Sequence, residues 1–215
     1  MSRAYRHLTP RYVVNRLRNL VDHRRHPDEP WLTRQANELL ASLILPTDVG
    51  LEFGSGRSTL WLARRAHRLT SVEHDRSWHQ AVTRQLAENG IANVEYLFRE
   101  QDVEEAAGDR SGYVRVVDTF AEQSLDFVLV DGIYRLDCVR AVLGRLKPGG
   151  MLILDDAQRY LPSASVSPGA RQERDGVASA GWSAILETVG DWRRIWTSSG
   201  VSDTAIWFKP AAARQ

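Results

Sequence analysis

Two short runs of apolar residues constrain the fold of this 215-residue chain more than any other feature. They are FVLV at 127–130 and MLIL at 151–154. Neither run alternates with polar residues, so each is typical of a strand that is buried on both faces, as the strands of parallel sheets are. Both runs lead directly into aspartates. We therefore expect a parallel sheet with acidic side chains at the ends of two buried strands.

The surrounding segments alternate between strand and helix patterns. Strands are expected at 49–53, 68–75, 93–100, 125–132 and 151–156. Helices are expected at 59–66, at 77–90 and from residue 134 onward, where Pro-Gly-Gly at 148–150 stops the last one. Because a helix links two parallel strands by crossing one face of their sheet, this alternation predicts an α/β fold. The expected architecture is Rossmann-like and doubly wound, with helices on both faces of a mostly parallel sheet.

The last third of the chain has a different pattern. Residues 161–176 are rich in Pro, Ser and Gly, which predicts a loop, and a short helix is expected at 182–189. The aromatic segments 192–197 and 204–210 are separated by a turn-like SSGVSD sequence and predict an antiparallel hairpin. With this C-terminal hairpin the sheet would have seven strands.

Two further helices are expected ahead of the first core strand. Val13, Leu17, Leu20 and Val21 recur at the spacing of one helical stripe, and a second helix is expected over 33–43. We expect residues 1–45 to form a helical lid over the site or an interface segment, as in a homodimer. Residues 46–215 would form the main domain, within a single globular unit.

Charge is concentrated at the N-terminus. Residues 1–26 contain seven arginines against a single acid, Asp22, a local charge of +6 in a chain whose total is +1. Such an arm can bind nucleic acid, anionic lipid or an acidic substrate. A solvated helix face in an arginine-rich protein explains the same pattern.

Other sequence features bear on localisation. No apolar run approaches the ~18 residues that a membrane span needs, and the first residues lack the apolar core of a secretory signal. The single cysteine, Cys138, cannot form an internal disulfide. A reducing cytoplasm is the expected compartment.

The sequence LEFGSGR at 51–57 indicates a ligand-binding loop. Gly54 and Gly56 follow the first core strand and lead into a helix, where backbone without Cβ atoms and free N–H groups can approach a ligand. Glu73 ends the second strand and can accept hydrogen bonds from a ribose diol. The GxGxxG fingerprint of dinucleotide-binding proteins is incomplete here, because its third glycine would fall at position 59, which is threonine. Alternatively, Gly54 and Gly56 serve only a tight turn between strand and helix, and Glu73 is a strand end held by a salt bridge.

Taken in order, these motifs resemble class I S-adenosylmethionine-dependent methyltransferases. The acid-x-Gly-x-Gly loop, the acid that ends the second strand, DFVLVDG and LKPGGMLILDD carry the resemblance over residues 49–156. The stretches LEFGSGRSTLWLA, SVEHD and LDDAQRYLP are similar to a bacterial branch that acts on small molecules. The resemblance implies S-adenosylmethionine as cofactor.

The resemblance also implies a role for each matching position. Its cofactor site would comprise Glu52, Gly54, Ser55, Gly56, Ser58, Glu73, His74 and Asp131. The loop would wrap the methionine and ribose, with Ser58 where a third glycine often stands. Glu73 would hold the ribose hydroxyls and His74 would lie against the adenine. Glu52 would face the amino-acid part, and Asp131 the ammonium or the transferred methyl.

Catalysis is expected at the aspartates that end the two apolar strands. Asp131, Asp155 and Asp156 would converge there, similar to the metal site of catechol-type O-methyltransferases, and an oxygen-rich trio suits Mg²⁺. Without a metal, Asp131 or Asp156 would act as general base. Nearby, Arg135 and Arg159 would either orient an anionic substrate or pair with these aspartates.

The sequence thus predicts a methyltransferase for small molecules, most simply with an oxygen acceptor. One alternative is a nucleic-acid methyltransferase that uses the basic arm. The strand that ends in VDG lacks the Asn/Asp-Pro-Pro-aromatic loop of many N-methyltransferases, which disfavours nucleic acid as the partner. The other alternative is a non-catalytic module that binds the cofactor and serves in assembly.

Overall fold

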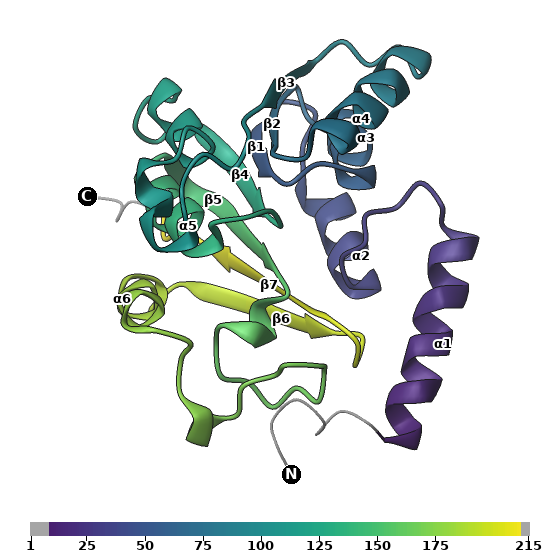
Figure 1. Cartoon of the computed structure of the whole chain (residues 1–215), viewed down its shortest axis with the longest axis vertical. Coiled ribbons are helices and arrows are strands. Elements are labelled where there is room, and N and C mark those ends of the chain that lie inside the picture. The colour runs from purple at the N-terminus through teal and green to yellow at the C-terminus, as the bar shows by residue number, and fades with distance from the viewer. Residues whose placement is uncertain (1–8, 212–215) are drawn as a thin grey trace.

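The computed structural model describes residues 9–211 and contains one seven-stranded sheet (Figure 1). The strand order is β3-β2-β1-β4-β5-β7-β6, with β7 antiparallel to both of its neighbours and the other pairs parallel. The strands are β1 Val49–Phe53, β2 Arg68–Glu73, β3 Val94–Phe98, β4 Leu125–Val130, β5 Leu146–Asp155, β6 Arg193–Ser198 and β7 Asp203–Phe208. The predicted sheet and its C-terminal hairpin are confirmed.

Helices cover both faces of this sheet. The α-helices are α1 Pro10–Arg25, α2 Arg34–Leu43, α3 Arg57–Ala63, α4 Arg76–Glu88, α5 Arg135–Val142 and α6 Ala180–Val189. Short 3₁₀ helices are η2 Glu105–Arg110, η3 Val114–Thr119, η4 Ala157–Arg159 and η5 Glu173–Asp175. The first two lie in residues 100–120, where the sequence pattern predicts no element, and η3 contributes Val114, Val116 and Val117 to the core.

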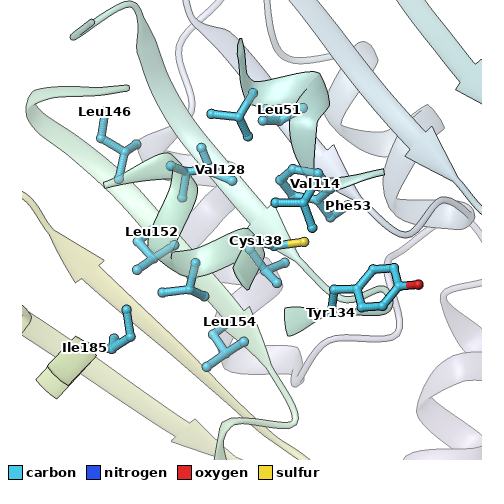
Figure 2. Packing of buried hydrophobic residues seen from close by; sticks show 14 of the residues in the cluster. Leu51, Phe53, Val114, Val128, Tyr134, Cys138, Leu146, Leu152, Leu154 and Ile185 are labelled. Atoms are coloured by element: carbon cyan, nitrogen blue, oxygen red, sulfur yellow. The ribbon is translucent and has the colours of Figure 1, made fainter. Parts of the chain in front are cut away.

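The two buried strands distribute their side chains between two core clusters. Phe127 and Leu129 of β4 pack with residues of α2 and α3, whereas Val128 and Val130 face the cluster that contains α5 and α6. Figure 2 shows the second cluster, with Cys138 of α5 and Ile185 of α6 beside Leu152. Since successive strand residues point to opposite faces, both faces of an uninterrupted apolar strand must be covered.

The helix predicted to run from residue 134 to the Pro-Gly-Gly stop at 148–150 is too long at its C-terminal end. The helix α5 ends at Val142, and β5 begins at Leu146. Leu125 pairs with Leu146 and Phe127 with Met151, so residues 147–150 form an irregularity within the strand pair. Pro148 has no N–H to donate and Gly149 has a φ of +83°, a combination that suits such an interruption.

The two N-terminal helices differ in how they pack. In α2, Ala36 and Leu40 belong to the core cluster of α3 and the sheet, so this helix is part of the globular body. In contrast, α1 has no buried residue and stands apart from the strands at one side of the molecule (Figure 1). Arg3 and Arg6 of the basic arm lie outside the described residues. A role for residues 1–45 as a lid or interface stays a prediction. None of the helices within residues 9–211 has the length and apolarity needed to cross a bilayer.

The loops after β1 and β4 are in direct backbone contact. Gly54 has a φ of +90°, and a Cβ atom built on it would lie 2.7 Å from the amide nitrogen of Gly132 and 2.8 Å from the carbonyl carbon of Asp131. Both the backbone conformation and the space therefore require glycine at this position.

We predict that Gly54→Ala lowers the free energy of unfolding by about 3 kcal/mol or more, because left-handed strain adds to a backbone clash. Gly90→Ala is the matched control, since Gly90 has a φ of +64° but no atom within 4 Å of a built Cβ. It is expected to cost only about 1 kcal/mol. Urea unfolding of both variants measures the difference, and equal losses would contradict the contact.

Candidate functional site

A cavity of about 640 Å³ opens at the carboxyl ends of β1, β2 and β4. It lies where the strand order reverses between β1 and β4, the point at which open α/β sheets bind their ligands. Its lining residues are Trp31, Gly54, Ser55, Gly56, Arg57, Ser58, Glu73, His74, Asp75, Ser77, Trp78, Gln85, Asp131 and Gly132. All the predicted cofactor residues lie here except Glu52.

The carboxylate of Glu73 is held by the loops on either side of it. Its Oε2 accepts hydrogen bonds from the backbone N–H and the hydroxyl of Ser55, at 3.0 and 2.7 Å. Its Oε1 accepts from the backbone N–H groups of His74 and Asp75, both at 2.8 Å. Since a carboxylate has about four acceptor sites, these four donors fix its position on the cavity wall.

Two aromatic side chains extend the contacts of the glycine loop. The hydroxyl of Ser55 lies 2.6 Å from the phenol oxygen of Tyr96 on β3. The indole of Trp78 donates to the carbonyl of Ser55 at 2.7 Å, and the Trp78 side chain lies beside Gly56. Gly56 itself has an extended φ of 162°, and a built Cβ would be in ordinary van der Waals contact with the Trp78 ring at 3.7 Å, so neither the backbone conformation nor the space demands glycine there.

Glu52 is buried beneath this loop and does not line the cavity. Its Oε2 accepts hydrogen bonds from the hydroxyls of Thr59 at 2.6 Å and Ser71 at 2.5 Å. Burial raises the pKa of Glu52 to about 7, although the hydroxyls of Ser58, Ser71 and Thr59 favour the charged form. Glu52 is therefore not placed to make the predicted contact with a ligand in the cavity. It holds Thr59 at the start of α3 and Ser71 of β2 by hydrogen bonds.

We predict a pH dependence of stability that belongs to Glu52. The folded pKa of about 7 lies above the value of 4.5 for an exposed glutamate. Between these two pH values the folded state binds more protons, so this contribution to stability is present at low pH and is lost as pH rises to about 7. The loss amounts to about 3 kcal/mol in total.

The comparison of wild type with Glu52→Gln isolates this effect, because the amide cannot titrate. The difference in unfolding free energy between the two proteins should shrink steadily from pH 4.5 to 7 in urea titrations. Glu95→Gln is the control, since Glu95 is half-exposed and pairs with Arg68 at the surface. A difference that stays constant over this range would show that Glu52 ionises normally.

Asp131 is the only predicted catalytic residue in the lining of the cavity. Its carboxylate accepts a hydrogen bond from Arg135 at 2.8 Å, and the same guanidinium donates to the carbonyls of Asp131, Gly132 and Asp155. Burial, with a further contribution from Asp156, raises the pKa of Asp131 to about 6 against the opposing effect of Arg135. Arg135 thus pairs with the aspartate and ties the ends of β4 and β5 together.

The other two aspartates have different partners. Asp155 is buried and accepts a hydrogen bond from Thr204 of β7 at 2.8 Å, and burial raises its pKa well above the ordinary value. Asp156 has a φ of 53° and pairs with Arg159 at 3.0 Å. Each of the three carboxylates therefore has its own partner. Asp131 pairs with Arg135, Asp155 accepts from the Thr204 hydroxyl, and Asp156 pairs with Arg159.

The expected Mg²⁺ site does not fit this arrangement. Within residues 9–211 no group of three or more His, Cys, Asp or Glu side chains is placed to hold a metal ion. The trio of Asp131, Asp155 and Asp156 shares a neighbourhood, but each side chain is directed to its own partner. We derive no step of the reaction through a metal.

Several lining residues are absent from the sequence-based prediction. Trp78, Ser77 and Gln85 come from α4, Arg57 from the start of α3, and Gly132 from the loop after β4. A sequence signal existed for Trp78, because it follows the N-cap Asp75 by three residues and so lies in the first turn beside the strand end. Trp31, from the segment between α1 and α2, also lines the cavity, whereas Trp61 of α3 is buried.

The fold is that of a Rossmann-like α/β protein with a cavity at the switch point of its sheet. A model of the family described as a methyltransferase domain matches residues 51–157. The chain belongs to the class I S-adenosylmethionine-dependent methyltransferases, as its motifs predicted. A search of curated protein sequences found no match.

Solved structures agree with this fold. A methyltransferase-like protein of Silicibacter pomeroyi is 24% identical, with 86% of this chain and 90% of that chain covered and a TM-score of 0.56. A Streptococcus mutans protein described as a methyltransferase, in complex with S-adenosylhomocysteine, is 11% identical, with 81% and 96% covered and a TM-score of 0.55. An rRNA methylase of Streptococcus thermophilus is 13% identical, with 82% and 95% covered and a TM-score of 0.55. At these identities the likeness shows the fold alone.

Proposed function

We propose that the protein methylates an oxygen atom of a small-molecule acceptor, with Asp131 as the general base. The observation that carries this proposal is the position of the Asp131 carboxylate in the wall of the same cavity as the glycine loop and Glu73. When bound, S-adenosylmethionine supplies an electrophilic methyl group on a sulfonium. The chain must then align the acceptor and remove its proton.

The electrostatic surroundings of Asp131 suit a base at neutral pH. With a pKa of about 6, the carboxylate is ionised at pH 7 and is still basic enough to take a proton from a hydroxyl group whose oxygen forms the new bond. The hydrogen bond from Arg135 fixes the direction of the carboxylate and leaves its other oxygen for the acceptor. Asp156, paired with Arg159, raises the pKa of Asp131 and so acts as a positioning residue rather than a second base.

We further propose that the cavity holds the cofactor by its ribose on Glu73. The cavity volume falls in the range of small-molecule sites, and the bare backbone of Gly54 and Gly56 leaves one wall open to a ligand. Because Glu73 already accepts four hydrogen bonds, a ribose diol has to displace one donor. The Ser55 hydroxyl is the donor that can turn away, since the phenol of Tyr96 already lies beside it.

We predict that Asp131→Asn lowers kcat/KM by a factor of about 10² to 10⁴, because the amide cannot accept the proton. The affinity for S-adenosylmethionine should change little. Wild-type kcat/KM should rise with pH to about 6 and then level off, since the base must be ionised. The measurement is transfer of radiolabelled methyl to a panel of hydroxyl-bearing small molecules.

Asp137→Asn is the matched control for this variant. Asp137 also pairs with an arginine of α5, Arg140 at 2.9 Å, but lies outside the cavity. Its activity should stay near that of the wild type. Methyl transfer to RNA or DNA in place of small molecules would favour the nucleic-acid alternative. Cofactor binding without turnover on any acceptor would favour a non-catalytic module.

A further inference from the structure

The helix α1 presents its polar side to its own chain. Asp22 forms an ion pair with Arg34 at 2.9 Å, and the ring of His23 meets the edge of Trp31 with 6.5 Å between ring centroids. Near the other end, the amide of Asn15 lies on the turn between β6 and β7, where a Cβ built on Gly200 would meet it at 2.1 Å. These contacts fix which side of the helix faces outward.

The outward side carries a continuous apolar stripe. At 100° per residue it covers an arc of about 120°. Its members are Val13, Val14, Leu17, Leu20 and Val21, and each is between 44% and 57% exposed. No residue of this 16-residue helix is buried. We call these five side chains the α1 stripe. An apolar patch of this kind marks a binding surface when it is continuous rather than scattered.

Arginines border the α1 stripe on both sides. Arg18 and Arg25 follow one flank, Arg16 follows the other, and Arg24 lies at the C-terminal end of the stripe. No ion pair between residues of the described range 9–211 involves any of these four side chains. Arg16 donates to the neighbouring hydroxyl of Tyr12 at 2.9 Å, which leaves its charge without a carboxylate partner among residues 9–211. The stripe is therefore flanked on both sides by arginines that have no carboxylate partner within residues 9–211.

We propose that α1 lies in the plane of an anionic lipid bilayer and attaches the protein to it. A helix whose apolar stripe is flanked by basic residues can bury the stripe among acyl chains while its arginines bind phosphate headgroups. An anionic bilayer thus accounts for both the apolar α1 stripe and the arginines that flank it. The helix is too polar to span the bilayer, so attachment is peripheral.

The charges disfavour the predicted homodimer through this helix. An antiparallel two-fold pairing of the α1 stripe about Leu17 would set Arg16 of one copy opposite Arg16 of the other, and Arg18 opposite Arg18, with like charges close together. The only acid of α1, Asp22, is already paired with Arg34. A nucleic acid would satisfy the arginines but leave the apolar side chains in water.

Attachment would bring the cavity close to the bilayer. Arg57 and Trp31 both line the cavity, and Arg57 donates to the backbone carbonyl of His23 on α1 at 3.5 Å while its guanidinium lies 5.4 Å from the Trp31 ring centre. The helix and the site are thus joined through two side chains. The inference does not depend on which acceptor the enzyme methylates.

The test is sedimentation of the full chain with vesicles. We expect binding to phosphatidylglycerol–phosphatidylcholine vesicles at low salt, release at high salt, and much weaker binding to phosphatidylcholine alone. Leu17→Glu should lower the bound fraction about tenfold, because a charge replaces a buried apolar group. Leu45→Glu is the matched control and should bind normally, since Leu45 is equally exposed, at 54%, but lies outside the stripe.

The electrostatic part is tested by a variant that replaces Arg16, Arg18, Arg24 and Arg25 with glutamine. It should lose binding to the anionic vesicles, whereas Arg84→Gln on the exposed side of α4 should not. Wild-type protein that fails to sediment with anionic vesicles would overturn the proposal. So would light scattering that shows a dimer which Leu17→Glu converts to a monomer, or equal sedimentation of Leu17→Glu and wild type.

Discussion

The contact between the loops after β1 and β4 is the constraint on which the rest of the site depends. Gly54 lies against the backbone of Asp131 and Gly132 with no room for a side chain, which brings the ends of two central strands together. This contact sets the glycine loop and the Asp131 carboxylate in the wall of one cavity. A ligand that lies on the loop is therefore within reach of the candidate base, and in the proposed reaction the packing of two backbones would set the distance between them.

Burial then gives each carboxylate of this region a different character. Glu52 lies under the loop with its pKa raised to about 7, and Asp131 lies in the cavity wall with its pKa raised to about 6 beside Arg135. Glu73 is instead saturated by backbone and hydroxyl donors. The same carboxylate group is thus a loop support at Glu52, a candidate base at Asp131 and a candidate cofactor-binding group at Glu73, because hydrogen-bond donors and exposure differ between these positions.

Local patterns predicted the fold well, because uninterrupted apolar strands and alternating helices are properties of neighbouring residues. The position of the cavity followed from Gly54, Gly56 and Glu73 by the same reasoning. The failure of the expected metal site was not predictable in this way, since the partner of Asp155 is Thr204, 49 residues away in the chain. The pairing of Asp156 with Arg159 is between near neighbours and was one of the two alternatives that the sequence left open. The end of α5 was missed because Pro148 and Gly149 read as a helix stop, whereas they form a break within the pairing of β5.

The most direct test of the central claim is a crystal structure with S-adenosylhomocysteine bound. The account predicts that the nucleoside lies in the cavity bounded by Gly54, Glu73 and Asp131. Its ribose hydroxyls should be within hydrogen-bond distance of Glu73, with the Ser55 hydroxyl turned away from that carboxylate. A nucleoside bound elsewhere, or one whose ribose makes no contact with Glu73, would contradict it.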